Sequence, residues 1–199
     1  MSSNSSLVAQ LREKTGCGIK DCKFALDECK GDLEKAIEYL RKKGLASAGA
    51  KSGRATNAGR VVSYIHSNGQ IGVLVELNCE TDFVANTDIF QELGKDLCMH
   101  ICAMKPIALD RQSLPKEIVE KEKEIYQEQM KTQLKDKPPE AQEKILVGKL
   151  DKFYKDFLLM EQLFVKDDKK SGEEIIKEKI ATLKENITIK RFARYQLGE

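Results

Sequence analysis

The feature that most constrains the fold is a pair of alternating apolar segments, "VVSYIHS" and "QIGVLVELNC", which are separated by Asn68 and Gly69. An Asn-Gly pair in this position is typical of a β-hairpin, because these two residues readily adopt the positive φ angles of a type I′ turn. Every second residue of the later segment is apolar or small: Ile71, Val73, Val75, Leu77 and Cys79. This alternation predicts a strand with one buried face, paired with its neighbour in a hairpin.

The first 45 residues have the spacing of helices rather than of strands. Three helices are predicted: one capped by Ser5 or Ser6 and stopped by "TGCG", one from about Ile19 to Gly31, and one from Asp32 to Gly44. Each helix carries its own apolar face, which is the requirement for a small helical core. We therefore expect a three-helix domain at residues 1–45.

Residues 46–59 contain only small, polar or basic side chains, which is typical of a linker that is helical in part. This part of the chain also begins the only purely basic stretch, formed by Lys51, Arg54 and Arg60. The whole chain has a net charge of +2, and the region around the hairpin is locally acidic. Nucleic-acid binding proteins usually present a broad basic face with aromatic side chains among the charges, so direct nucleic-acid binding is not favoured.

The second half of the chain combines further helices with one more strand. A helix capped by Thr87 or Asp88 follows the hairpin, and two charged amphipathic segments on either side of "KDKPP" predict a helical hairpin over residues 114–157. An S-x-x-E capping box at Ser171 predicts another helix, and "NITIKRFARYQL" predicts a final strand. Residues 60–199 are therefore expected to form an α+β core with a three-stranded antiparallel sheet.

The composition is that of a globular protein, with 199 residues of which 41% are hydrophobic and 33% charged. No window approaches 18 uncharged apolar residues and the N-terminus lacks the segments of a secretory signal, so we expect a cytoplasmic protein that does not bind membranes. The six cysteines include no C-x-x-C pair. We interpret them as reduced, buried side chains rather than zinc ligands, and expect no metal site.

The segment "NCETDFVAN" breaks the strand pattern with polar and acidic residues next to a phenylalanine. Glu80 and Asp82 stand where phosphoryl acceptors and metal ligands are often found, but they are accompanied by no Gly-rich phosphate loop and no nucleophile with an evident His. We therefore do not expect an enzyme. From the pattern alone, the favoured interpretation is that Thr81 or Asp82 caps a helical turn while Phe83 packs into the core.

Two motifs, "LREKTGCGIKDCKFAL" and "NCETDFVAN", resemble in this order the bacterial translation elongation factor Ts family. The segments "FVKDD" and "ENITIKRFARYQLG" extend the resemblance over essentially the whole chain. The resemblance implies a guanine nucleotide exchange factor for elongation factor Tu, the GTPase that delivers aminoacyl-tRNA to the ribosome. It also implies that the N-terminal three-helix domain is ubiquitin-associated-like and that no cofactor is needed.

The resemblance assigns the segment around Phe83 a role in the partner. In the family the matching segment, here Thr81, Asp82, Phe83 and Val84, reaches the region of the Mg²⁺ site of elongation factor Tu and dislodges the ion. Displacing Mg²⁺ weakens GDP binding, because the ion and a backbone cradle hold the phosphates.

The N-terminal helices of the family dock on the GTPase domain of the partner. By position, Leu11, Arg12, Ile19 and Lys20 inherit that contact. The family often has two methionines where Ile19 and Lys20 stand, and a proline where Leu163 stands.

The resemblance also implies an oligomeric state. Longer family members carry a duplicated core whereas this chain has one, so a homodimer that binds two partners in a 2:2 complex is expected. Two rival functions remain open: an adaptor that uses its first 45 residues as a ubiquitin-type binding module, and a tRNA or ribosome binder that uses Lys51, Arg54 and Arg60.

Overall fold

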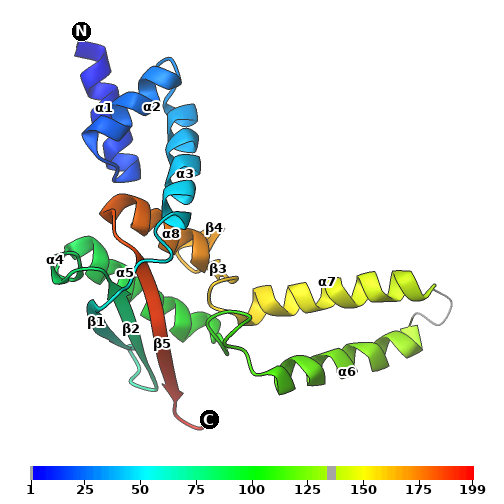
Figure 1. The fold of residues 1–199 in the computed structure, drawn as a ribbon. Coiled ribbons are helices and arrows are strands. Elements are labelled where there is room, and N and C mark those ends of the chain that lie inside the picture. Colours follow the sequence, from blue (N-terminus) through cyan, green and yellow to red (C-terminus); the bar gives the residue numbers. More distant parts are fainter. Residues whose placement is uncertain (1, 134–137) are drawn as a thin grey trace. The chain divides into compact units, whose positions relative to one another are not determined.

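The computed structural model describes residues 2–133 and 138–199, which form an α+β fold as predicted (Figure 1). The elements in chain order are α1 (Ser2–Thr15), α2 (Ile19–Glu28), α3 (Leu33–Gly49), β1 (Ala58–Ile65), β2 (Ile71–Cys79), α4 (Asp82–Ala85), α5 (Asp88–Met104), α6 (Lys116–Gln133), α7 (Pro139–Phe157), β3 (Leu163–Phe164), β4 (Asp167–Ser171), α8 (Gly172–Leu183) and β5 (Ile187–Gln196). They fall into two compact units, described in turn below.

The first unit comprises Met1–Val62, Val75–Lys95 and Glu174–Phe192. Its three N-terminal helices enclose a small core made of Leu11, Cys22, Ala25, Leu26, Ala36 and Leu40. Asp32 caps α3 as predicted, since its side chain accepts a hydrogen bond from the Lys35 N–H at 3.0 Å. The first helix begins at Ser2, so the prediction that Ser5 or Ser6 caps it is wrong.

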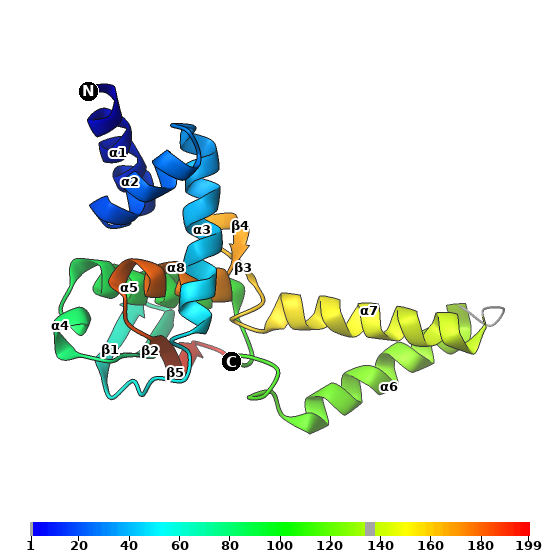
Figure 2. The same ribbon diagram turned by 45° about the horizontal axis from the view of Figure 1, so that its top comes forward.

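The third helix also extends beyond the predicted end at Gly44. It continues to Gly49, and the additional turn buries Ala48. Gly44 does not end the helix. A Cβ at this position would lie 3.0 Å from the Ala181 Cβ of α8, so the glycine allows α3 and α8 to approach closely (Figure 2).

The rest of the predicted linker is bonded to the sheet and its flanking residues. The amide of Asn186 donates to the Arg54 carbonyl at 2.8 Å, and the hydroxyls of Thr56 and Thr188 are 2.8 Å apart. Arg54 also forms an ion pair with Glu80 at 3.4 Å. This segment is therefore attached to β5 and to the end of β2.

The main sheet is antiparallel and has the order β1-β2-β5, with β2 in the centre. The predicted face of β2 is confirmed, because Val73, Val75, Leu77 and Cys79 are buried. The predicted type I′ turn is wrong. Positive φ angles occur among the described non-glycine residues only at Lys30, Lys105 and Lys184, whereas a type I′ turn requires one at Asn68. Instead the Asn68 side chain accepts a hydrogen bond from the Gln70 N–H at 3.1 Å within a longer loop.

The second unit comprises Ser63–Leu74, Asp96–Glu173 and Ala193–Glu199. The predicted helical hairpin is confirmed as α6 and α7, which run antiparallel to each other (Figure 1). Most of the "KDKPP" turn lies outside the described residues. Pro139 occupies the first turn of α7, where the missing N–H of proline does no harm.

The short strands β3 and β4 pair as a small antiparallel ribbon that the sequence analysis did not predict. Their charged segment "VKDDKKS" has no apolar alternation, so nothing in it is typical of a strand. The ribbon is held from inside by Phe164, which is buried and stacks on the His100 ring with centroids 5.0 Å apart.

Candidate functional site

The segment that follows β2 forms a single helical turn, α4, directly at the end of the strand (Figure 1). Thr81 has an extended backbone and its side chain accepts a hydrogen bond from the Val84 N–H at 3.4 Å, so it is the N-cap. The Asn86 side chain donates to the Asp82 carbonyl at 2.8 Å and closes the other end of the turn. The predicted cap at Thr81 is therefore confirmed.

Glu185, which lies just before β5, holds the start of this turn. Its carboxylate accepts two hydrogen bonds from Thr81, one from the N–H at 3.0 Å and one from the hydroxyl at 2.6 Å. The Cys79 thiol donates to the Thr81 carbonyl at 3.1 Å. Burial, followed by the nearby Glu185 carboxylate, raises the pKa of the Cys79 thiol and keeps it protonated as a donor.

Arg60 of β1 holds the end of the turn. Its Nε donates to the Ala85 carbonyl at 2.9 Å, and its Nη2 donates to the Asn86 side chain. The Thr87 hydroxyl donates to the Val84 carbonyl at 2.7 Å and accepts from the Phe90 N–H, which starts α5. The turn is therefore bonded at both ends to neighbouring elements of the first unit.

Phe83 stands on this anchored turn with 82% of its surface exposed. The prediction that it packs into the core is wrong, although the cap that was predicted with it is present. Asp82 is also exposed, Val84 is half-buried, and Ala85 is the buried residue of the turn. The turn thus exposes two consecutive side chains, the Asp82 carboxylate and the Phe83 ring, just after the end of β2.

The predicted N-terminal contact residues divide into two kinds. Leu11 is completely buried in the three-helix core, so its side chain packs inside the protein. Arg12 of α1 and Lys20 of α2 are exposed, and Ile19 at the start of α2 has 59% of its surface exposed. Phe24, which is 48% exposed, was missed because its position in α2 gave no sign of which way it points.

The basic stretch that was considered for nucleic-acid binding is engaged within the protein. Arg54 is paired with Glu80, and Arg60 binds the end of α4. Glu185 and Arg60 are the residues of this site that the sequence analysis missed. A polar residue that binds a loop distant in the sequence leaves no periodic pattern by which to find it.

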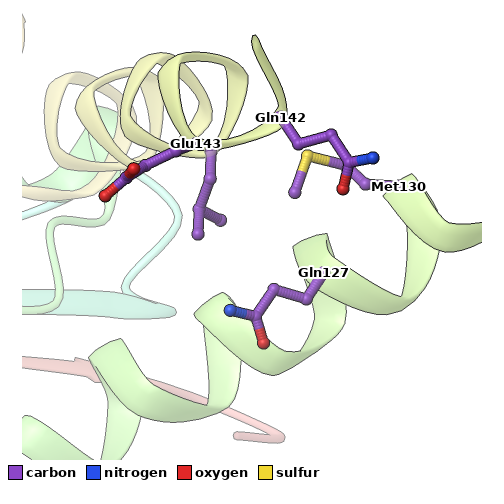
Figure 3. Close-up of a pocket in the computed structure, with 5 residues that line it drawn as sticks. Gln127, Met130, Gln142 and Glu143 are labelled. Atoms are coloured by element: carbon purple, nitrogen blue, oxygen red, sulfur yellow. The ribbon is translucent and has the colours of Figure 1, made fainter. Parts of the chain in front are cut away.

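A hollow lies between α6 and α7, lined by Gln127, Met130, Gln142, Glu143 and Leu146 (Figure 3). This described lining offers two amides, a thioether, an aliphatic side chain and one carboxylate, which gives no pair of groups for acid–base or nucleophilic chemistry. No group of His, Cys, Asp or Glu side chains in residues 2–133 and 138–199 has the arrangement of a metal site. Within the same residues, no helix has an apolar stretch that would cross a bilayer.

Comparisons with known proteins identify the family of the chain. A family model described as "Elongation factor TS" matches residues 48–199. The chain is 53% identical to "Elongation factor Ts" of Fervidobacterium nodosum over 199 residues, which cover 100% of both chains. It is 53% identical to the protein of the same name from Thermotoga maritima over 193 residues, 97% of this chain and 95% of that one. It is 51% identical to that of Geobacter sulfurreducens over 199 residues, 100% of this chain and 91% of that one. The chain belongs to the elongation factor Ts family.

Proposed function

We propose that this protein promotes the release of GDP from elongation factor Tu by inserting the Thr81–Val84 segment near the Mg²⁺ site of that GTPase. The single observation that carries the proposal is the exposure of Phe83, 82%, on a turn that is bonded at both ends. An exposed phenylalanine contributes little to the stability of its own protein, so its place on an ordered turn is best explained by a partner.

The energetics favour Phe83 as a wedge. Burying a phenylalanine side chain is worth about 1.5–3 kcal/mol, which is enough to stabilise a displaced loop in the partner. Because Thr81 and the end of α4 are already held, little conformational entropy is lost when the ring is buried. Dislodging Mg²⁺ from the partner then removes one of the two features that hold the GDP phosphates.

Asp82 gives the same turn a charged acceptor. It lies in the first turn of α4 and is exposed, so it can accept hydrogen bonds from backbone N–H groups of the partner. A carboxylate beside a Mg²⁺ site also competes with the phosphates for positive charge. The coupling between the two binding equilibria is reciprocal: if this protein weakens the binding of GDP to elongation factor Tu, GDP weakens the binding of this protein by the same factor.

The exposed side chains of Arg12, Ile19 and Lys20 are proposed to form the contact of the N-terminal helices with the GTPase domain. Leu11 would support this surface from the three-helix core rather than touch the partner. The division into a three-helix domain at residues 1–45, a linker and an α+β core stays a proposal, and so does a location in the cytoplasm, where translation takes place.

An Ile19→Asp variant should need a higher concentration to reach half-maximal exchange.

The proposed function is tested by the rate at which a fluorescent GDP analogue leaves elongation factor Tu with and without this protein. We expect faster release that saturates with concentration, and tighter binding to the nucleotide-free partner than to its GDP form. An adaptor or an RNA binder would leave the release rate unchanged and would show no dependence on nucleotide. Such a result would contradict the proposal.

A further inference from the structure

We infer that Glu185 and Arg60 are positioning residues that hold the Phe83 turn in the orientation in which it enters the partner. This inference rests on the proposed function. The two residues lie far apart in the sequence: Arg60 lies in β1 and Glu185 lies just before β5. No motif assigned either residue to this turn, and neither needs to touch the partner for this role.

The turn needs such support because it is too short to be stable by itself. A helix of four residues, Asp82–Ala85, lies far below the length at which an isolated helix forms in water. Its largest side chain, Phe83, points outward and anchors nothing, and Ala85 is the buried residue that α4 contributes. The order of the turn must therefore come from bonds at its two ends.

Glu185 supplies the attachment at the start of the turn. Its two carboxylate oxygens each accept one hydrogen bond from Thr81, at 3.0 Å from the N–H and at 2.6 Å from the hydroxyl. Hydrogen bonds to an ionised acceptor are about twice as strong as neutral ones. The pair fixes both the backbone and the side-chain rotamer of the N-cap, and therefore the direction in which α4 starts.

Arg60 supplies the attachment at the other end. Its Nε binds the Ala85 carbonyl at 2.9 Å, which is one of the carbonyls that a helix end leaves without a partner. Its Nη2 binds the Asn86 side chain, which in turn donates to the Asp82 carbonyl at 2.8 Å. Through Asn86, the guanidinium is thus linked to the carbonyl of Asp82, the residue that precedes Phe83.

A wedge acts only if it arrives in the correct position, and a displacement of about 1 Å can reduce a rate by roughly a hundredfold. Releasing either end of α4 would let Phe83 sample other orientations while the ring itself stays intact. Glu185 and Arg60 should therefore affect exchange through Phe83, with which neither has a hydrogen bond.

The test combines Glu185→Ala and Phe83→Ala in a double-mutant cycle on the full chain. With wild-type Phe83, we expect Glu185→Ala and Arg60→Met each to lower the maximal GDP release rate about five- to tenfold. In the Phe83→Ala background, we expect Glu185→Ala to change the rate less than about twofold, because there is no ring left to position. A purely structural role would cost the same factor in both backgrounds, and that result would overturn the inference.

A second variant at the Glu185 attachment and a matched control add to the test. Thr81→Val loses the hydroxyl that binds Glu185 and should lower the exchange rate, as Glu185→Ala does. Glu174→Ala removes a carboxylate that pairs with Arg41 instead, at 2.8 Å, and should leave the rate unchanged as the matched control.

The order of the turn is read separately by NMR relaxation of the Asp82, Phe83 and Val84 amides in the protein alone. These amides should be as rigid as the strands in the wild type and in Glu174→Ala, and should become mobile in Glu185→Ala. If they stay rigid, the positioning role is wrong. If Phe83→Ala does not slow GDP release, the proposed function loses its wedge, and the NMR result alone then decides whether Glu185 orders the turn.

Discussion

At the scale of single residues, His100 is a titratable side chain that is completely buried in the second unit. Its Nδ1 accepts a hydrogen bond from the Val165 N–H at 3.2 Å, and its Nε2 lies 3.0 Å from the side-chain amide oxygen, Oε1, of Gln162. Nε2 therefore carries the proton, and the neutral ring is the form that satisfies both partners. Gln162 in turn donates to the carbonyls of Met104 and Asp156. The network connects α5 to the β3–β4 ribbon.

The titration of His100 predicts how stability depends on pH. Burial lowers the pKa of His100 below its ordinary value of 6.5, although the hydrogen bond to Gln162 opposes this. The unfolded chain then binds more protons than the folded chain below about pH 6.5, so the free energy of unfolding should fall as the pH drops from there towards the depressed pKa. Above pH 6.5 this contribution is fully present.

Urea unfolding measured between pH 5 and pH 8 checks this prediction, since most carboxylates stay ionised in that range. A His100→Phe variant should be less stable but should lose the slope below pH 6.5. His66→Gln is the matched control, because His66 is exposed, and should keep the slope. An unchanged slope in His100→Phe would show that another group is responsible.

At the scale of elements, two helical glycines differ in what surrounds them. A Cβ at Gly94 of α5 would lie 2.6 Å from the Val62 Cγ2 of β1, so the missing side chain lets the helix approach the sheet. Nothing lies within 4 Å of a Cβ at Gly148 of α7. The same substitution should therefore have opposite effects in the two helices.

Gly94→Ala should destabilise the protein, because overpacking typically costs about 1–3 kcal/mol and outweighs the gain in helix propensity of about 1 kcal/mol. Gly148→Ala should stabilise it by about 0.5–1 kcal/mol through helix propensity alone. Chemical unfolding followed by circular dichroism measures both. Equal stabilisation by the two variants would mean that Val62 of β1 can move away from α5 with no loss of stability.

At the scale of the whole molecule, the proposed homodimer needs an apolar surface on which two copies can meet. Ile65 and Leu74 of the β1–β2 hairpin are 64% and 45% exposed, and Tyr195 and Leu197 near the C-terminal end of the chain are 70% and 74% exposed. Exposed apolar groups mark interaction surfaces when they adjoin, and the Leu197 N–H donates to the Gln70 carbonyl of the hairpin loop at 3.0 Å. They support the proposed homodimer, in which a second copy supplies the other half of a duplicated core.

Light scattering should give a mass of twice 22.5 kDa at micromolar concentration. Leu74→Glu should shift the mass towards that of a monomer, because it places a charge in the apolar surface. Glu174→Ala, which removes a carboxylate from α8, is the control that should stay dimeric. A wild-type mass of 22.5 kDa across the whole concentration range would rule out the homodimer.

Sequence patterns predicted the elements that carry their own apolar periodicity, such as the buried face of β2 and the apolar faces of the three N-terminal helices. They failed where structure depends on contacts distant in the sequence. Gly44 resembled a helix end, yet its role is the close approach to Ala181. The β3–β4 ribbon depends on Phe164 and His100, which are 64 residues apart.

The candidate site was predictable only where it depends on neighbouring residues in the sequence. The cap at Thr81 follows from local chemistry, whereas the exposure of Phe83 does not follow from its neighbours. A resemblance to a family indicated a partner, but the attachments through Glu185 and Arg60 could be found only from the folded structure.

The most direct test of the account is the Phe83→Ala variant, with GDP release from elongation factor Tu and thermal unfolding measured on the same sample. We expect release to slow about tenfold or more while the melting temperature changes by only a few degrees, because the ring is 82% exposed. Phe90→Ala is the matched control, since Phe90 is completely buried and its truncation should cost about 3–5 kcal/mol of stability. Unchanged GDP release in Phe83→Ala, together with a large fall in its melting temperature, would contradict the account.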